Sequence, residues 1–347
     1  MKKYLTFMAF AMTAVFGLVS ISCSEEDDEK GDDSSSTPVG ALVGDDAKAN
    51  AAVANLRLAA VNRSKRDYRY AYDEKGNLET ISDMLNDWSA SAKDNFKIVV
   101  NDQYTGGWGD ETYTFNISNN LVTSYSVKWN DVNEYGNSTG TDIWNFKYNA
   151  KGQLTGATWT ADGSGSDGWD WKGEGTTTIT YSADGRIALV DYTEWEEEDG
   201  DKYTYKKTTE YEYDSSSKVN KFYQYIPEFF ADIYIDIEHE YVLSFAYVGL
   251  FGKSSSYVPT KSTEIRNYDG EEYSYTNTNY TCSFNSDGTL QSAVYNGDNN
   301  YNFTYTTVGT RSVFDTNLPV WRQGEQAKDK RMSRRDMIKS KREHRRQ

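Results

Sequence analysis

Three tryptophans stand in short glycine-rich, acidic segments, where an exposed indole could stack on a sugar ring. Trp108 lies in Gly106–Asp110, and Trp169 and Trp171 lie in Gly168–Gly173, each near an aspartate. A flat aromatic ring offers a large contact area, and a neighbouring carboxylate accepts hydrogen bonds from hydroxyl groups. These segments predict exposed rings that bind a glycan or a protein partner. The alternative is that the rings fold back and anchor their own loops.

The residue types that usually carry catalysis are sparse. His344 falls near the C-terminus, and His239, the one histidine of the body, has no nucleophile-elbow sequence to accompany it. Composition excludes a zinc site built from several His or Cys ligands. Cys282 lies on the aromatic side of an alternating strand and is expected to be a buried thiol. We therefore assign no catalytic residue, no metal ligand and no cofactor.

Carboxylates are plentiful, and their densest run is Glu194–Asp201. Such a run is typical of a solvated hairpin loop. Two alternatives stay open. One is a carboxylate-dependent hydrolase, which needs two acidic groups that face each other. The other is a loose calcium site, formed by this run or by Asp162, Asp167 and Asp170.

Cys23 has the most specific predicted chemistry, which is acylation. Two lysines near the start precede the uncharged apolar run Leu5–Val19, which is shorter than the ~20 residues of a membrane span and typical of a signal peptide. The run leads into a lipobox-like sequence, although Ser20 stands where leucine is usual. We expect residues 1–22 to be removed and Cys23 to carry lipid. The alternative is an ordinary signal peptide beside a stray cysteine.

A dense acidic segment follows Cys23. Residues 23–44 are too polar to offset the entropy of ordering and predict a disordered tether. An acidic stretch directly after the lipid-bearing cysteine resembles the export signal of surface lipoproteins in Bacteroides-type bacteria; the alternative is a linker without a sorting role. We expect a lipid-anchored outer-membrane protein on the cell surface or, without export, facing the periplasm.

Charge is divided unevenly along the chain. The formal net charge is -16, yet Arg322–Gln347 holds eleven Lys or Arg against four Asp or Glu. The acidic body repels nucleic acid, so no nucleic-acid partner is expected. The basic tail, residues 319–347, has three interpretations: contact with anionic lipid headgroups or lipopolysaccharide, folding against the acidic body, or a solvated tail.

A recurring pattern predicts the architecture of the body, residues 45–318. Each copy reads aromatic-x-aromatic, Asp or Asn, a short turn, then an aliphatic residue. The aromatics before the turns are Tyr72, Phe115, Tyr148, Tyr181, Tyr213 and Phe284. The alternation indicates half-buried strands, and the Gly and Asn residues suit tight turns. We predict a single all-β domain of ~33-residue hairpin repeats. It is a curved antiparallel meander of about twelve to fourteen strands, which should form a barrel or half-barrel.

Two segments break this pattern. Asp45–Val61 is alanine-rich, with apolar residues at helical spacing, and predicts a helix. Tyr241–Phe251 predicts a buried helix that ends before Gly252. This insert stands where the spacing of the copies leaves room for one more hairpin. We therefore expect it to plug or cap one end of the curved sheet.

The strand residues between the aromatics are polar. They are Arg69, Lys147, Glu212, Ser274 and Asn302. A barrel that crosses a membrane needs an outward band of apolar residues, so a channel is not expected.

The hairpin copies, the insert Phe245–Lys253 and the following Tyr257–Lys261 resemble a family of Bacteroides-type lipoproteins of unknown function with a porin-like fold. Tyr273–Tyr275 and Phe284–Gly288 fit the same family, and the resemblance covers roughly residues 66 to 308. It implies a fold and a location, but no activity and no functional residues.

The leading hypothesis is a non-enzymatic lipoprotein that binds a ligand, for instance a glycan, through Trp108, Trp169 and Trp171. One alternative is a structural or interaction subunit of an outer-membrane complex. The other is the carboxylate-dependent hydrolase.

Overall fold

The computed structural model describes residues 41, 54–63, 66–84, 88–104, 107–133, 136–225, 240–295, 299–308 and 338. All of them belong to one compact unit, Thr37–Gln347. The predicted signal peptide, Cys23, His239 and nearly all of the tether and the basic tail lie outside the described residues.

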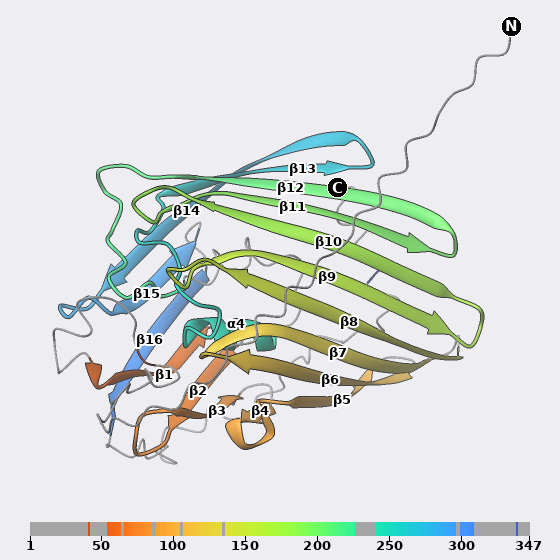
Figure 1. Cartoon of the computed structure of the whole chain (residues 1–347), viewed down its shortest axis with the longest axis horizontal. Helices are drawn as coiled ribbons and strands as arrows, with labels where there is room; N and C mark the ends of the chain where they lie inside the picture. Colours follow the sequence, from red (N-terminus) through yellow and green to blue (C-terminus); the bar gives the residue numbers. More distant parts are fainter. Residues whose placement is uncertain are drawn as a thin grey trace, which may run out of the picture. The chain divides into compact units, whose positions relative to one another are not determined.

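Sixteen strands form one antiparallel sheet over these residues (Figure 1). Their bounds are β1 Leu56–Arg63, β2 Arg66–Tyr72, β3 Leu78–Asp83, β4 Trp88–Ser91, β5 Ile98–Tyr104, β6 Gly107–Ser118, β7 Leu121–Asn133, β8 Gly136–Tyr148, β9 Leu154–Gly165, β10 Asp170–Tyr181, β11 Ile187–Glu198, β12 Asp201–Glu212, β13 Lys261–Tyr268, β14 Glu271–Phe284, β15 Leu290–Tyr295 and β16 Asn299–Thr307. A 3-10 turn, η1 (Ala92–Asp94), and a helix, α4 (Glu240–Tyr247), complete the described elements.

The sheet is nearly closed into a barrel. Every strand pairs with its sequence neighbour except at one place, and β1 pairs with β16 to join the two ends of the series. The exception is the opening between β4 and β5, which are consecutive strands linked through η1. The predicted curved antiparallel meander is therefore confirmed, with more strands than expected.

The predicted helix over Asp45–Val61 is wrong in its second half. Leu56–Arg63 is β1, and Val61 pairs with Phe303 on one side and with Tyr68 on the other. A strand bonded on both sides satisfies its backbone without a helix, so tertiary pairing overrides the helical spacing of the alanines.

The turn of the third copy shows why these hairpins form. Asn149 Oδ1 accepts hydrogen bonds from the backbone N–H of Lys151 at 2.9 Å and of Gln153 at 3.0 Å. Gly152 has a φ of 76°, which an L side chain rarely adopts. The strand register shifts by one residue at Tyr148, which bends the ladder just before the turn. The hairpin predicted after Tyr213 is wrong, because the chain leaves the sheet there and returns only at β13.

A series of tyrosine hydroxyls ties neighbouring strands together at this end of the sheet. Each hydroxyl donates to a backbone carbonyl near the start of the preceding strand in the chain. The pairs are Tyr72 to Leu58, Tyr148 to Val122, Tyr181 to Leu154, Tyr213 to Ile187 and Tyr305 to Leu290, at 2.7–2.9 Å. Phe115 and Phe284 occupy the same pre-turn position without a hydroxyl. The choice of Tyr or Phe at this position therefore has structural consequences.

The predicted buried helix is present as α4, and it packs against the concave side of the sheet (Figure 1). Phe245 stacks on Phe115 at 4.3 Å between ring centroids, and it meets Phe96 edge-on at 5.6 Å. The Tyr247 ring lies 6.0 Å from Tyr68 on β2. The helix thus contacts strands on both sides of the opening between β4 and β5. Burial of its apolar face holds the open seam together.

The segment Leu250–Val258, here called the strap, runs from α4 across the ends of successive hairpins. Its backbone hydrogen bonds join it to the start of β7, to the β8–β9 and β10–β11 turns, and to the loop after β12. Val122 N–H donates to Leu250 O, Lys253 N–H to Gly152 O, Ser256 N–H to Gly185 O, Val258 N–H to Lys218 O and Asn220 N–H to Ser256 O, at 2.8–3.1 Å. The strap and α4 together cover this end of the sheet, called the turn end below. The expectation that the insert caps one end agrees with these contacts.

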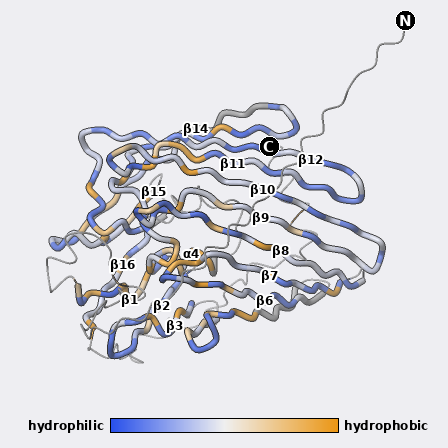
Figure 2. Tube along the Cα trace, viewed as in Figure 1, coloured by the Kyte–Doolittle hydropathy of each residue, from blue (hydrophilic) through white to orange (hydrophobic). Residues whose placement is uncertain are grey.

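The outward face of the strands is polar. On β10, Lys172, Glu174 and Thr176 all point outward and are exposed. Hydrophobic residues gather instead at α4 and on alternate strand positions (Figure 2). Large exposed apolar residues are scattered over the described surface and form no band. No helix in the described part of the chain has the length and apolar character needed to cross a bilayer.

Candidate functional site

Indoles and carboxylates share the concave side of strands β6 to β11, beyond the part that α4 covers. We call this set the acidic–aromatic face. Its members are Glu111, Trp129, Asp131, Asp142, Trp144, Trp159, Trp169, Trp171, Glu194 and Glu196. They lie on the same side as Phe115 and Phe146, which contact the α4 region. Strand alternation therefore directs them into the barrel.

Cross-strand pairing arranges the face in rows. One row runs Tyr125, Trp144, Trp159, Gly175, Glu194, Tyr205 across β7 to β12. The next runs Asp142, Ala161, Gly173, Glu196, Tyr203, and a third runs Glu111, Trp129, Gly140, Gly163, Trp171, Glu198. Within the first row, the rings of Tyr125 and Trp144 stack at 4.7 Å, and those of Trp144 and Trp159 stack at 6.3 Å. The pairing register thus creates a continuous aromatic surface.

Glycines on neighbouring strands hold the indoles flat. A Cβ on Gly163 would come within 2.6 Å of Trp129, and one on Gly173 would come within 2.6 Å of Trp159. Gly140 and Gly175 are covered in the same way by these two rings. Since any side chain there would push the indole off the sheet, the glycines and tryptophans form one packed unit. The rings are consequently preorganised rather than free to rotate.

Five carboxylates of the face are deeply buried: Glu111, Asp131, Asp142, Glu194 and Glu196 each expose 6% or less of their surface. Tyr113 donates its hydroxyl to Glu111 at 2.7 Å, and Tyr192 donates to Glu194. The Trp159 indole N–H donates in turn to the Tyr192 hydroxyl at 2.9 Å. These bonds link the carboxylates to the aromatic rows.

The sequence left two alternatives for Trp169 and Trp171, exposed rings or rings that fold back, and their burial agrees with the second, because they expose only 2% and 3% of their surface. Gly168, with a φ of 91°, turns the chain so that Trp169 points inward, where its indole N–H donates to Glu198 at 2.7 Å. Trp171 follows on the inward side of β10, opposite Gly163. Trp108 belongs to β6, and its side chain lies outside the described residues. Ligand binding by these three residues stays a prediction.

The acidic run Glu194–Asp201 is also placed differently from the expected solvated loop. It forms the end of β11 and a tight turn, so its side chains alternate across the sheet. Glu194 and Glu196 face inward, whereas Glu197 pairs with Lys172 at 2.8 Å on the outer face. Within the described chain, no cluster of His, Cys, Asp and Glu is arranged to hold a metal ion.

Sequence reasoning missed most of this face. Trp129, Trp144 and Trp159 stand inside ordinary alternating strands, so nothing in their immediate sequence marks them. The available signal was the pair Gly173 and Gly175 on β10, since glycine inside a strand often marks close approach of another group.

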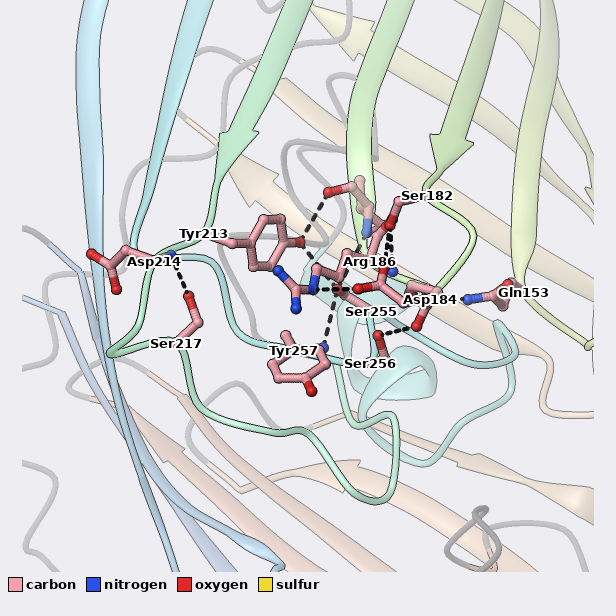
Figure 3. Close-up of polar contacts among 12 residues, drawn as sticks. Gln153, Ser182, Asp184, Arg186, Tyr213, Asp214, Ser217, Ser255, Ser256 and Tyr257 are labelled. Carbon is pink, nitrogen blue, oxygen red and sulfur yellow. Dashed lines mark hydrogen bonds and ion pairs between the residues drawn. The ribbon is translucent and has the colours of Figure 1, made fainter.

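The turn end carries a second polar cluster, where the strap meets the turn between β10 and β11 (Figure 3). The Arg186 guanidinium lies 4.2 Å from the ring centroid of Tyr257 and 5.4 Å from that of Tyr213. It also pairs with Asp184 at 2.9 Å. Ser255 accepts a hydrogen bond from the Ile187 N–H and contacts the Tyr213 hydroxyl at 3.1 Å. Burial raises the pKa of Tyr213 to about 12. We interpret this cluster as the anchor of the strap.

These features define a nearly closed antiparallel β barrel whose turn end is capped by an insert and whose interior is acidic and aromatic. Two solved structures with similar folds are described as porin-like proteins. One, from Bacteroides uniformis, is 16% identical, with a TM-score of 0.37, and the match covers 72% of this chain and 95% of the other. The second, from Bacteroides vulgatus, is 13% identical, with a TM-score of 0.43, covering 71% and 97%. No protein-family model and no curated protein matches the sequence. At these identities and TM-scores, neither likeness transfers a function to this chain.

Proposed function

We propose that this chain is a non-catalytic binding protein, anchored by lipid at Cys23 to the outer membrane and exposed on the cell surface. Its binding site is the acidic–aromatic face, and its ligand is a saccharide. The observation that carries the proposal is the row of preorganised indoles on one concave side of the sheet, interleaved with buried carboxylates.

The chemistry of the face suits a polyhydroxylated ring. Indoles offer flat surfaces for the apolar faces of a sugar, and carboxylates and the Tyr192 hydroxyl offer acceptors for its O–H groups. Sites for small ligands are usually concave, largely aromatic and furnished with a few fixed polar groups. The indole side chains are buried in the structure. A saccharide can therefore reach them only if the residues packed over them move aside.

A titration of the purified mature chain with a panel of oligosaccharides, followed by tryptophan fluorescence and calorimetry, tests the proposal. It is run with and without Ca²⁺. Trp171→Ala should weaken binding at least tenfold. The matched control is Trp195→Ala, because Trp195 lies on the outer side of β11 with Lys202 over its ring at 4.2 Å. Absence of binding across the panel, or equal losses for both variants, would rule the saccharide site out.

The anchor is tested separately. Cys23→Ala should release the protein from the membrane fraction into the soluble fraction of cells that express it, and should abolish incorporation of labelled palmitate. Protease added to whole cells then distinguishes the two sides, because only a surface protein is digested. A variant that stays membrane-bound and palmitate-labelled would contradict the assignment of Cys23.

A further inference from the structure

The charges on the acidic–aromatic face are of one sign. At the inward positions of β6 to β11 that the structure describes, the charged residues are all carboxylates. Elsewhere round the described barrel, inward cations are already paired with carboxylates: Lys207 and Arg266 both contact Glu264, and Arg66 contacts Asp83. A concave surface with several buried carboxylates favours a cationic occupant, because burial makes each carboxylate depend on positive or hydrogen-bonding partners.

The chain itself contains a segment of the opposite charge. Arg322–Gln347 is strongly basic, and it follows β16, whose last residue is Thr307. About 30 residues separate Val308 from Ile338, a length that can span on the order of 100 Å when extended. The segment can therefore reach any part of the barrel interior.

Ile338 places part of this segment in the core. It is helical, exposes 4% of its surface and belongs to the one continuous hydrophobic cluster that the buried side chains of the described barrel form. In the sequence it is followed directly by Lys339 and preceded closely by Arg334 and Arg335. A buried apolar residue between cations matches a surface that carries both indoles and carboxylates.

We propose that the basic C-terminal segment, Arg322–Gln347, is the resident occupant of the acidic–aromatic face. Ile338 packs among the apolar side chains, and the flanking Arg and Lys side chains pair with the buried carboxylates. The segment thereby covers the indoles. One consequence rests on the proposed function: if the face binds a saccharide, the saccharide must compete with the protein's own tail.

Limited trypsin digestion of the mature chain, without any sugar, tests the occupancy. The rate of cleavage after Arg334 and Arg335 is measured by mass spectrometry and compared with that of a synthetic peptide of residues 322–347. Cleavage in the protein should be at least tenfold slower than in the peptide, and 1 M NaCl should narrow the difference, since salt screens charge pairs. Equal rates in the protein and the peptide would overturn the proposal.

Two pairs of variants locate the contact. Glu196→Gln should raise the tail cleavage rate about tenfold, whereas Glu197→Gln, its outward neighbour on β11, should not. Ile338→Asp should likewise expose the tail, whereas Ser340→Asp adds the same charge two residues away and should have a smaller effect. Circular dichroism confirms that each variant is folded. A tail that stays protected in both Glu196→Gln and Ile338→Asp would contradict the docking.

The outcome does not depend on the saccharide. Protection of the tail without sugar binding would support the inference and refute the proposed function. Sugar binding to a chain whose tail is cleaved freely would refute the inference and support the function. If both hold, Ile338→Asp should tighten sugar binding, because the competing segment is released.

Discussion

Gly252 of the strap sits directly against the backbone carbonyl of Gly152, in the turn between β8 and β9. A Cβ at Gly252 would collide with that oxygen, and the residue also has a φ of 83°. The next residue, Lys253, donates its N–H to the same carbonyl at 2.8 Å. The strap can approach the turn this closely only because Gly252 has no side chain.

Gly252→Ala should therefore destabilise the protein by about 2–4 kcal/mol, from left-handed strain plus steric overlap. Thermal and urea unfolding measure the loss. Gly249→Ala is the matched control, because Gly249 has a similar φ of 78° but nothing near its missing Cβ. Its loss should be close to 1 kcal/mol. Equal losses for the two variants would show that the approach to Gly152 is unimportant.

The tyrosine hydroxyls should contribute measurably and independently. Tyr181→Phe removes the bond to the Leu154 carbonyl, and Tyr148→Phe removes the bond to Val122. Each variant should lose about 0.5–1.5 kcal/mol in urea unfolding, the usual net value of one hydrogen bond. Because the two bonds join different pairs of strands, the double variant should lose the sum to within about 0.5 kcal/mol. Unchanged midpoints in both single variants would refute this role.

The anchor of the strap should depend on aromatic contact more than on the ion pair. Arg186→Ala should cost about 1–2 kcal/mol, because the guanidinium lies over Tyr257 and Tyr213. Asp184→Asn should cost less, since the Asp184 side chain is 53% exposed and surface ion pairs contribute little. A double-mutant cycle of Arg186→Ala with Tyr257→Leu measures the coupling directly. A coupling energy near zero would assign the loss to Arg186 alone.

Cys282 should be inert in the folded protein. Burial raises the pKa of its thiol to about 12, so almost no reactive thiolate exists at pH 8. Iodoacetamide should modify it at least a hundredfold more slowly in the native protein than in urea. Thr281→Cys in a Cys282→Ser background is the control, because residue 281 is exposed on the opposite face of β14. Similar rates at the two positions would show that Cys282 is accessible.

Alkaline pH should weaken the fold through Tyr213. Burial raises its pKa from the usual value of about 10 to about 12, so the folded state keeps a proton that the unfolded state releases. Stability is unaffected below pH ~10 and falls between pH ~10 and ~12, by up to about 1.4 kcal/mol per pH unit for this group. Tyr213→Phe should show a shallower decline over that window in urea unfolding at several pH values. An identical slope would exclude Tyr213 as a contributor.

Local sequence predicted the strands and most turns well, because their determinants are local. The Asn149 side chain, the positive φ of Gly152 and the aromatic alternation before them all act within one hairpin. The same reasoning failed over Leu56–Val61, where helical spacing lost to pairing with β16, a strand about 240 residues later in the sequence. The same reasoning also failed after Tyr213. The hairpin motif recurs there, but the chain leaves the sheet and returns only at β13.

The sequence predicted the residue types of the candidate site but not where those residues lie. Tryptophans and carboxylates are the informative residues in the sequence, but local sequence could not decide between exposed and folded-back rings at Trp169 and Trp171, which are buried. Trp144 and Trp159 were overlooked because their importance comes from being cross-strand partners. Which residues become cross-strand neighbours depends on the register between two strands, and the sequence of one strand alone does not specify that register.

The sequence by itself determined an acidic body with a basic C-terminus, an alternating antiparallel architecture, and a buried helical insert. These follow from composition, two-residue periodicity and glycine turns, which are properties of short segments. Only the tertiary structure decided that β1 pairs with β16, that α4 bridges the seam, and that indoles lie flat on glycines of neighbouring strands. The physical reason is that these features are long-range contacts, whose energies appear only when distant strands are brought into register.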